Sequence, residues 1–516
     1  MNWSLPGTSR RPDLPARLTP HSYSKPAVTY RADYDVVIIG AGMSGICMGI
    51  KLRERGIHNF LILEKSSELG GTWHDNSYPG ACCDVPSVLY SYSFAPNPDW
   101  THKFSPQEEI RAYFQRCAEQ AQLTSKLRLN TTVQSARWQE QEGHWRVTLD
   151  GGESFTARSL VSALGQLNLP HIPEFRGQDD FAGHSFHSAR WDHDYDLTGK
   201  RVAVIGNAAS ALQFIPRIAA QVKQLYVYQR SANFIIKRKD RPYKSWEQWV
   251  FRYVPFAQKL MRGLIYLRGE WVLYPVLRNR AKWLRKLWEK WCEHYRNREI
   301  SDPQLRARLT PDYRLGCKRI LISDDYYQAF QQPGVELVTS PISGMGPEGV
   351  RTEDAEERPV DLIIYATGFK ASAMHSAVDY RGEGGISLQH AWQHGAEAYR
   401  SVAVHGFPNF FMLYGPNSNL GSNSIIFMVE RQANYVVDCL HELLRHKLRA
   451  LQVKDHVQHA YNERMQEDLA QTVWVTSCHS WYKNAAGKVT NNWPRSTLSY
   501  WWHMRRPDFA DFDRRA

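Results

Sequence analysis

The amino-acid sequence predicts an α/β protein built on two parallel β-sheets. Two widely separated segments carry this prediction, because each combines a short apolar strand, a turn rich in small residues, a helix and a second strand. Of the 516 residues, 43% are hydrophobic and 22% are charged, which excludes disordered, collagen-like and coiled-coil chains. At roughly 150 residues per domain, this length suggests two to four domains.

The first segment starts with an apolar, β-branched run at residues 34–40 (YDVVIIG), which is typical of a buried parallel strand, and continues into the turn GAGMSG. Gly40 makes the tight turn, Gly42 lets backbone N–H groups approach a pyrophosphate, and Gly45 lets helix and strand pack closely. The next strand ends at Glu64, 24 residues beyond Gly40, where a carboxylate can accept hydrogen bonds from a ribose. This combination predicts a Rossmann-like dinucleotide-binding domain.

The same pattern recurs in residues 201–231. A strand ends at Gly206, a turn and a helix follow, and the next strand ends at Arg230, again 24 residues beyond the first glycine. A carboxylate at this position repels a 2′-phosphate, whereas a guanidinium attracts one. The first site therefore suits FAD, whose ribose is free, and the second suits NADPH. The alternative for the second segment is an α/β domain that keeps the turn without the ligand.

The second turn departs from the first at its middle position. Ala208 stands where the first turn has Gly42, and its methyl group is expected to crowd a pyrophosphate. The residues of this unit expected to contact NADPH are Gly206, Asn207, Ala208, Ser210, Ala211, Arg230 and Ser231.

Two further apolar strands, at residues 160–165 and 361–368, each end in a glycine. They are interpreted as the chain's exit from a flavin domain and its return to that domain, which is therefore discontinuous. The first half of the chain divides into a flexible N-terminal arm (1–33), the first segment of the FAD-binding domain (34–170), an inter-domain linker (171–195) and the first segment of the NADPH-binding domain (196–239). The remainder divides into a basic, tryptophan-rich helical insert (240–310), the second segment of the NADPH-binding domain (311–358), and the second segment of the FAD-binding domain with a substrate-side C-terminal region (359–516).

The net charge of +12 is concentrated in the insert, where residues 241–310 contain sixteen Lys or Arg and six Asp or Glu. The favoured interpretation is a helical subdomain whose apolar stripe packs inward, because apolar residues recur at helical spacing. The second interpretation is a helix at a membrane surface, which the same composition fits. Nucleic-acid binding is not expected, since no nucleic-acid-binding motif accompanies the charge. The tryptophans of the insert are Trp246, Trp249, Trp271, Trp283, Trp288 and Trp291.

No metal site is expected. The eight cysteines form no C-x-x-C pair. His184, His187 and His193 lie close together in the sequence, but no nearby acid or cysteine completes a set of metal ligands. His187 is expected to serve inter-domain structure instead. The N-terminus has no apolar signal segment, and the chain has no run of about 18 apolar residues, so a soluble, cytoplasmic protein is expected.

Three motifs lie outside the two turns. Residues 70–84 contain Gly-Gly-Thr-Trp and Tyr-Pro-Gly and end in Asp84, and residues 316–319 read Gly-Cys-Lys-Arg. The third motif, at residues 181–192, matches F-x-G-x-x-x-H-x-x-x-W-[PD] through Phe181, Gly183, His187, Trp191 and Asp192. Together with both turns and residues 480–482, these motifs resemble those of class B flavin-dependent monooxygenases of the Baeyer–Villiger type. The resemblance covers roughly residues 34 to 500.

The resemblance implies a reaction cycle with FAD and NADPH as coenzymes. NADPH reduces FAD, O2 adds to the reduced flavin, and the resulting peroxyflavin attacks a small-molecule ketone to give an ester or a lactone. Arg319 matches the active-site arginine of the family. Asp84 is expected to pair with it, to position it, and to help tune the flavin–nicotinamide region. A permanently cationic, multi-donor group suits the developing oxyanion charge.

The resemblance also places residues around the coenzymes. Lys318 would hold the 2′-phosphate together with Arg230 and Ser231. Trp481 matches a position near the substrate and the nicotinamide. The positions that match residues lining the flavin are Thr72, Trp73 and Tyr90.

Other functions remain open at this point. The nearest alternative is oxygenation of sulfur or nitrogen, because the same peroxyflavin, when protonated, is electrophilic. A second is an NADPH oxidase that releases its peroxide. From a different class, the chain could be a catalytically silent, membrane-associated binding protein that retains the fold. No protein partner is identifiable.

Overall fold

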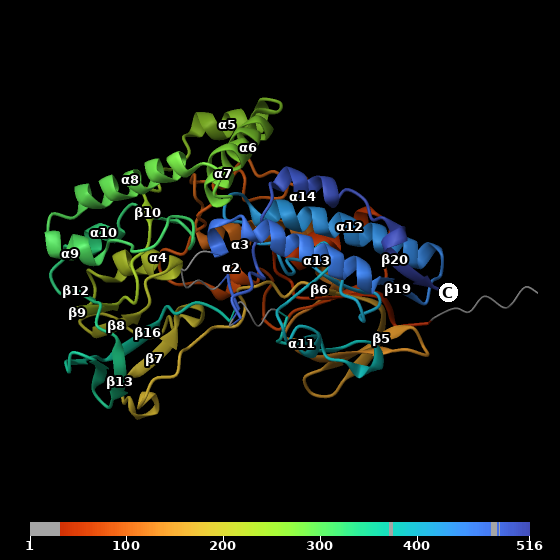
Figure 1. The fold of residues 1–516 in the computed structure, drawn as a ribbon, viewed down its shortest axis with the longest axis horizontal. Coiled ribbons are helices and arrows are strands. Elements are labelled where there is room, and N and C mark those ends of the chain that lie inside the picture. Colours follow the sequence, from red (N-terminus) through yellow and green to blue (C-terminus); the bar gives the residue numbers. More distant parts are fainter. Residues whose placement is uncertain (1–30, 371–374, 476–481, 485) are drawn as a thin grey trace, which may run out of the picture.

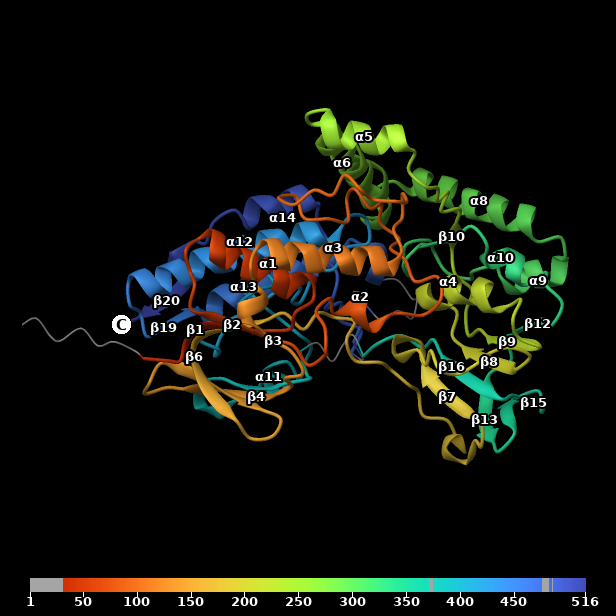
Figure 2. The same ribbon diagram turned by 180° about the vertical axis from the view of Figure 1, so that it is seen from behind.

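The computed structural model describes residues 31–370, 375–475, 482–484 and 486–516, and most of the predicted N-terminal arm lies outside them. Two sheets occupy opposite halves of the molecule, with helices packed against them (Figure 1). The same division is visible from behind (Figure 2). The predicted α/β fold with two parallel sheet cores is confirmed.

The first sheet is centred on the parallel pair β1 and β6, and its strands run in the order β17-β4-β5-β6-β1-β2-β3, with β18 beside β6. Side chains of β1 alternate between two cores, Val36 and Ile38 in one and Val37 and Ile39 in the other. The strand is apolar throughout because both of its faces are covered. The strands are β1 (Tyr34–Ile39), β2 (Phe60–Leu63), β3 (Leu127–Arg128), β4 (Val133–Gln139), β5 (His144–Leu149), β6 (Ser154–Ser162), β17 (Asp379–Arg381) and β18 (Phe410–Met412).

The larger of these two cores includes residues of α1 (Met43–Glu54), α3 (Gln107–Gln120) and α12 (Ile425–Arg445). Helix α1 starts directly after the first glycine turn, and α12 packs against it from a distant part of the chain. This packing holds the N-terminus of α1 at the edge of the sheet where β1 ends.

The second sheet has five parallel strands in the order β12-β9-β8-β16-β7. Helix α4 (Ala209–Ile218) follows β8 and buries Leu212, Phe214 and Ile215 against the sheet. The strands are β7 (His184–His187), β8 (Arg201–Ile205), β9 (Gln224–Tyr228), β12 (Val335–Val338) and β16 (Leu362–Tyr365).

The predicted domain boundaries are wrong in two places. The strand at 361–368 was expected to return the chain to the first sheet, but β16 pairs with β8 and β7 in the second sheet, with Leu362 opposite Val202. The chain rejoins the first sheet only at β17. The segment 171–195 is not merely a linker, because it supplies the edge strand β7. An apolar run predicts a buried strand but does not reveal which sheet accepts it.

The remaining strands form small sheets, and the remaining helices cover the two halves. The strands are β10 (Ile235–Ile236) with β11 (Leu321–Ile322), β13 (Ile342–Gly346) with β14 (Gly349–Thr352) and β15 (Glu357–Pro359), and β19 (Ala450–Val453) with β20 (Phe512–Arg515). The helices are α2 (Thr72–Asp75), α10 (Tyr326–Ala329), α11 (Leu388–Ala391), α13 (Asp455–Ala470) and α14 (Thr497–His503).

The insert is helical, but its tryptophans are not all packed inward. Trp288 is buried, whereas Trp249 and Trp271 are 58% and 72% exposed, and Trp246, Trp283 and Trp291 are exposed as well. The expectation of an inward apolar stripe is therefore wrong for most of them. Within the described parts of the chain, no helix has the length and apolar character needed to cross a membrane. The helices of the insert are α5 (Ser245–Tyr253), α6 (Ala257–Arg268), the π-helical η4 (Gly269–Leu273), α7 (Tyr274–Leu277), α8 (Lys282–Glu299) and α9 (Pro303–Arg308).

Candidate active site

A cavity of about 2720 Å³ takes its wall from both halves of the molecule. Gly45 and Ala211 lie behind the two turns rather than in the wall, and Trp481 lies outside the described residues. The fingerprint residues Phe181, Gly183, His187, Trp191 and Asp192 do not line the cavity. The predicted site residues that do line it are Gly40, Gly42, Glu64, Thr72, Trp73, Asp84, Tyr90, Gly206, Asn207, Ala208, Ser210, Arg230, Ser231, Lys318 and Arg319.

The first turn requires glycine at two positions. Gly40 has a φ of +106°, and a Cβ there would lie 2.7 Å from the carbonyl oxygen of Ala163. A Cβ on Gly45 would lie 1.9 Å from the carbonyl oxygen of Gly40. The buried carboxylate of Glu64 accepts hydrogen bonds from the backbone N–H groups of Ala41 (2.7 Å) and Ser66 (3.0 Å). The loop is thus drawn close to the strand ends, with Glu64 fixed beside it.

The second turn reproduces the first. Gly206 has a φ of +108°, and a Cβ there would lie 2.5 Å from the carbonyl oxygen of Ala366, just beyond β16. Ala208 has a φ of −84° and a ψ of −161°, close to the −74° and −172° of Gly42. Because this conformation is open to any residue, Ala208 replaces glycine without backbone strain. Its effect on a bound pyrophosphate stays a prediction.

Three polar residues gather beyond the end of β9. Lys318 Nζ donates a hydrogen bond to Ser231 Oγ at 2.6 Å, although 87 residues separate the two. Burial lowers the pKa of Lys318, and the positive charge of the neighbouring Arg230 lowers it further. Two cations held near one hydroxyl form a place where a strongly anionic group is favoured.

Asp84 and Arg319 form an ion pair in the cavity wall. Arg319 Nη2 donates a hydrogen bond to Asp84 Oδ1 at 2.7 Å. The negative charge of Asp84 raises the pKa of Arg319 above its usual range, so the guanidinium is cationic at every physiological pH. The side chain of Arg319 is still 43% exposed, so part of the guanidinium faces the space inside the cavity.

Aromatic side chains lie next to this pair. Trp73 Nε1 donates to the hydroxyl of Tyr90 at 3.1 Å, and the two rings meet edge to face. Tyr414, whose φ is +59°, also lines the cavity and donates its hydroxyl to Asn419 Oδ1 at 2.7 Å. Sequence reasoning missed Tyr414 and Asn419, because neither belongs to a motif and only the folded chain brings them to the wall.

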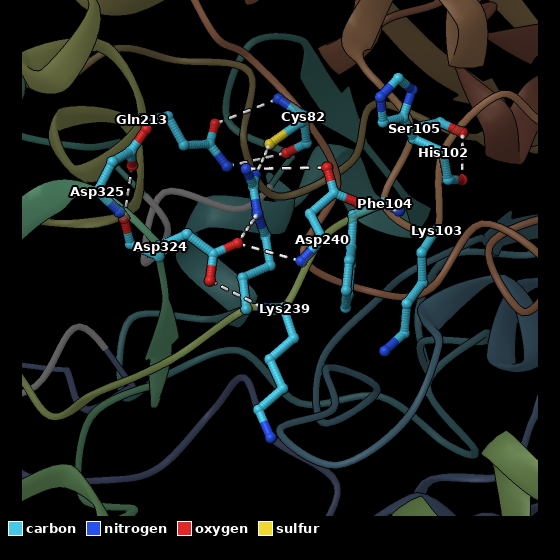
Figure 3. Close-up of polar contacts among 12 residues, drawn as sticks. Cys82, His102, Lys103, Phe104, Ser105, Gln213, Lys239, Asp240, Asp324 and Asp325 are labelled. Atoms are coloured by element: carbon cyan, nitrogen blue, oxygen red, sulfur yellow. Dashed lines mark hydrogen bonds and ion pairs between the residues drawn. The ribbon is translucent and has the colours of Figure 1, made fainter. Parts of the chain in front are cut away.

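The segment that leads to Asp84 is tied to the other half of the molecule by contacts that the sequence did not predict (Figure 3). Gln213 of α4 donates to the carbonyl oxygen of Cys82 at 2.9 Å and accepts from the N–H of Cys82 at 3.3 Å and from the hydroxyl of Tyr78 at 2.9 Å. Arg238 donates to Cys82 Sγ at 2.7 Å. Residues of the second half therefore hold Cys82 in place, and Cys82 lies only two residues before Asp84.

Two aspartates extend this network (Figure 3). Asp324 accepts hydrogen bonds from the backbone N–H groups of Lys239 (2.9 Å) and Asp240 (3.1 Å). Asp240 in turn accepts from the N–H of Phe104 at 3.1 Å, which belongs to the first half. Polar contacts around Cys82 and Asp240 thus help to join the two halves of the molecule.

The fingerprint residues pack behind the site. Buried His187 lies in β7, accepts a hydrogen bond from the N–H of Ala189 at 3.1 Å, and meets the ring of Phe369 edge-on. Burial lowers the pKa of His187 to about 4. Trp191 packs against Phe214 of α4. Since Phe369 lines the cavity, the fingerprint supports the wall from behind.

Asp192 makes a polar contact of its own, 2.9 Å from His184 Nε2. Among the residues with described positions, no group of three or more His, Cys, Asp or Glu side chains is arranged to hold a metal ion.

The chain is similar to known flavoprotein oxidoreductases. Residues 37–251 match the family model described as pyridine nucleotide-disulphide oxidoreductase. Among solved structures, an oxidized steroid monooxygenase bound to NADP is 30% identical, with a TM-score of 0.81 over 93% of this chain and 99% of that one. OTEMO in complex with FAD and NADP is 28% identical, with a TM-score of 0.83 over 94% of this chain and 99% of that one.

Curated relatives are more similar still. A Baeyer–Villiger monooxygenase of Pseudomonas aeruginosa is 42% identical over 469 residues, which are 90% of this chain and 88% of that protein. A Baeyer–Villiger monooxygenase of Streptomyces coelicolor is 41% identical over 481 residues, 92% of each chain. On this identity over almost the whole length, the chain belongs to the Baeyer–Villiger monooxygenases.

Proposed function

We propose that this enzyme uses FAD, NADPH and O2 to insert one oxygen atom beside the carbonyl group of a small-molecule ketone, giving an ester or a lactone. The observation that carries the proposal is the Asp84–Arg319 ion pair in a cavity whose wall includes both glycine turns. Membership of the Baeyer–Villiger monooxygenases supports the reaction type. The coenzymes in the solved relatives support FAD and NADPH.

The two turns fit the two coenzymes. A Cβ at Gly40 or Gly206 would collide with backbone, so each loop lies close enough to its sheet for its N–H groups to meet a pyrophosphate. Glu64 uses one lone pair on each carboxylate oxygen for backbone N–H groups and keeps others for ribose hydroxyls. Bound in these places, FAD activates O2 and NADPH supplies two reducing equivalents.

In this proposal the half built on the first sheet holds FAD and the half built on the second sheet holds NADPH. Thr72, Trp73 and Tyr90 line the wall next to the first turn and would face the flavin. Trp481, which was expected on the substrate side, lies outside the described residues.

Arg319 would stabilise the negative charge that develops on oxygen when the ketone carbonyl is attacked. Its guanidinium carries five N–H donors in a planar fork, and Asp84 occupies only part of that fork. Asp84 would orient the remaining donors toward the substrate and keep the guanidinium cationic. Donors that an ion pair fixes in advance stabilise such charge without reorganisation.

Arg230, Ser231 and Lys318 would bind the 2′-phosphate of NADPH. A phosphate dianion placed among them relieves the repulsion between the two cations that lowers the pKa of Lys318. It also gains charge-assisted hydrogen bonds from all three side chains. This arrangement would discriminate NADPH from NADH, which has no 2′-phosphate.

Contact of residues 240–310 with a membrane surface is a further component of the proposal. Two observations support this contact. Trp246, Trp249 and Trp271 are exposed, and residues 241–310 contain sixteen basic and six acidic residues.

A ketone panel tests the reaction directly. The purified enzyme is incubated with NADPH, O2 and cyclic, linear and aromatic ketones, while NADPH consumption and product mass are followed together. The expected result is an ester or lactone heavier than the ketone by one oxygen atom, formed in step with NADPH consumption. Oxygenation of thioethers or amines with no ketone product would instead indicate the heteroatom oxygenase. NADPH consumption that yields only hydrogen peroxide would indicate the oxidase.

A further inference from the structure

Exposed apolar side chains are concentrated in one region of this molecule. Most of the large hydrophobic residues exposed within the described chain lie on α5, α6, η4, α8 and α14. Phe256 is 75% exposed, Leu260 66%, Trp271 72% and Trp502 58%. We call α5, α6, η4 and α14, with the turn between α5 and α6, the apolar face.

The four helices of this face are joined to one another although α14 lies far along the chain. Thr497, the first residue of α14, donates its hydroxyl to the hydroxyl of Tyr266 in α6 at 2.8 Å. Its backbone N–H donates to the buried carboxylate of Glu270 in η4 at 3.1 Å. Figures 1 and 2, which are opposite views, both place α5, α6 and α14 along the upper edge of the molecule. The face is therefore one surface with a fixed shape.

Helices α5 and α6 bury almost none of their residues completely. Helix α5 contains two tryptophans, a phenylalanine and a tyrosine, yet no residue of α5 is fully buried. In α6 only Gln258 is buried. A concentration of exposed apolar side chains of this kind is typical of a surface that a partner or a membrane covers.

The turn between α5 and α6 presents an apolar tip. Val254 and Phe256 flank Pro255 there, and Phe256 has a φ of +63°, a conformation that is unfavourable for a bulky side chain. The backbone thus holds an aromatic ring outward at the end of a helical hairpin. An aromatic tip of this kind suits insertion below the headgroups of a lipid layer.

The charges around the face indicate which kind of partner it would attract. Lys244, Lys259 and Arg268 are exposed on α6 and on the segment leading to α5. Of the acids nearby, Glu247 is paired with Arg241 at 2.6 Å, Asp99 is paired with Arg252 of α5, and Glu270 is buried. A second copy of the chain would bring two basic faces together, which repel each other, whereas an anionic lipid surface attracts them.

We infer that the apolar face docks on an anionic membrane surface, with the α5–α6 tip and the exposed Trp501 and Trp502 of α14 below the headgroups and the basic side chains at the phosphate level. Apolar area and basic charge act together in such binding, and long Lys and Arg side chains can reach the headgroups from partly inserted helices. The inference extends the predicted membrane contact of the insert to α14. It concerns binding alone and is independent of the oxygenation reaction.

Co-sedimentation of the flavin-loaded full chain with large vesicles tests this inference. Vesicles of phosphatidylcholine are compared with vesicles containing phosphatidylglycerol. Binding is expected to be at least tenfold tighter to the anionic vesicles and to weaken as salt is added. Failure to bind the anionic vesicles, or equal binding to both kinds, would overturn the inference.

Matched variants locate the surface. The double variant Phe256→Ser, Leu260→Ser is expected to weaken binding at least tenfold, whereas Ile386→Ser, which removes an apolar side chain of 51% exposure beside α11, should leave it unchanged. Lys244→Ser with Lys259→Ser should weaken binding to anionic vesicles only, and exposed Lys223→Ser should have no effect. The unfolding midpoint of each variant confirms that it is folded. If light scattering instead shows a dimer that Phe256→Ser, Leu260→Ser dissociates, while vesicle binding is unaffected, the face is a protein interface and the inference is wrong.

Discussion

The guanidinium of Arg319 donates a hydrogen bond to the carboxylate of Asp84 at 2.7 Å across 235 residues of sequence. The aspartate comes from the loop after α2 in the first half of the molecule, and the arginine lies just before β11 in the second. The pair faces a cavity bounded by both glycine turns. Its geometry therefore depends on how the two halves are held together.

Replacement of Arg319 tests its proposed contribution to oxygenation. Arg319→Ala is expected to keep FAD bound and reducible by NADPH, but to lower ketone turnover by about 10²–10³, the usual loss when an oxyanion donor is removed. Anaerobic bleaching of the flavin and product formation are measured on the same sample. Arg319→Lys, which keeps the charge but not the fork, should recover only some of the activity. Unchanged ketone turnover in Arg319→Ala would contradict the role.

Replacement of Arg230 tests the 2′-phosphate site. Arg230→Ala removes a charge-assisted hydrogen bond worth on the order of 1.5–3 kcal/mol, so the KM for NADPH should rise about tenfold to a hundredfold. The KM for NADH should change little, because NADH offers no phosphate to lose. Steady-state kinetics with NADPH and with NADH give the ratio of the two KM values. An unchanged preference for NADPH would rule out Arg230 as the selecting residue.

The middle position of the second turn can be tested by restoring glycine. Ala208→Gly removes a methyl group at a backbone conformation that either residue adopts, so stability should change by less than about 1 kcal/mol. If the methyl group crowds the pyrophosphate, the variant binds NADP+ more tightly in a fluorescence titration. Equal or weaker binding would show that the methyl group is accommodated.

The first position of the same turn provides the contrast. Gly206→Ala must hold a φ of +108° and place its Cβ 2.5 Å from the carbonyl oxygen of Ala366. The free energy of unfolding is expected to fall by about 2–5 kcal/mol, from strain and overpacking together. Urea unfolding measures the difference. A change as small as that of Ala208→Gly would contradict the steric account of the turn.

Gln213, which lines the cavity, is predicted to position Asp84 through its hydrogen bonds to Tyr78 and Cys82. Gln213→Ala removes three hydrogen bonds to Tyr78 and Cys82 and should loosen the segment that carries Asp84. Ketone kcat is expected to fall more than the KM for NADPH rises, because the phosphate site lies elsewhere. Gln139→Ala on β4 is the control. Equal effects of the two replacements would mean that Gln213 has no positioning role.

His187 should make the free energy of unfolding depend on pH. Burial lowers its pKa in the folded protein to about 4 from the ordinary value of 6.5, so below pH 6.5 the unfolded chain takes up a proton that the folded chain refuses. The contribution of His187 to the free energy of unfolding is then fully present above pH 6.5. It is lost progressively as the pH falls toward 4, by roughly 3 kcal/mol in total. His187→Asn should flatten the pH dependence of urea unfolding in this window, and exposed His58→Asn should not. Parallel curves for wild type and His187→Asn would contradict this account.

Features that depend on neighbouring residues were predicted correctly from the sequence. Both strand–turn–helix units form where the glycine patterns placed them, and their equivalent glycines have nearly equal φ values of +106° and +108°. A left-handed turn against a strand end excludes a side chain whatever the rest of the chain does. The helical character of the insert followed equally from the spacing of its apolar residues.

The sequence by itself determined the local units, their opposite charges at Glu64 and Arg230, and the basic, aromatic composition of the insert. Only the tertiary structure decided that β16 pairs with β8 across about 160 residues, that Gln213 holds the segment before Asp84, and that most tryptophans of the insert are exposed. The physical reason is that turn geometry and periodicity arise from adjacent residues. Sheet membership, cross-chain hydrogen bonds and burial depend on which distant surfaces pack together, and many sequences of the same local pattern can pack in different ways.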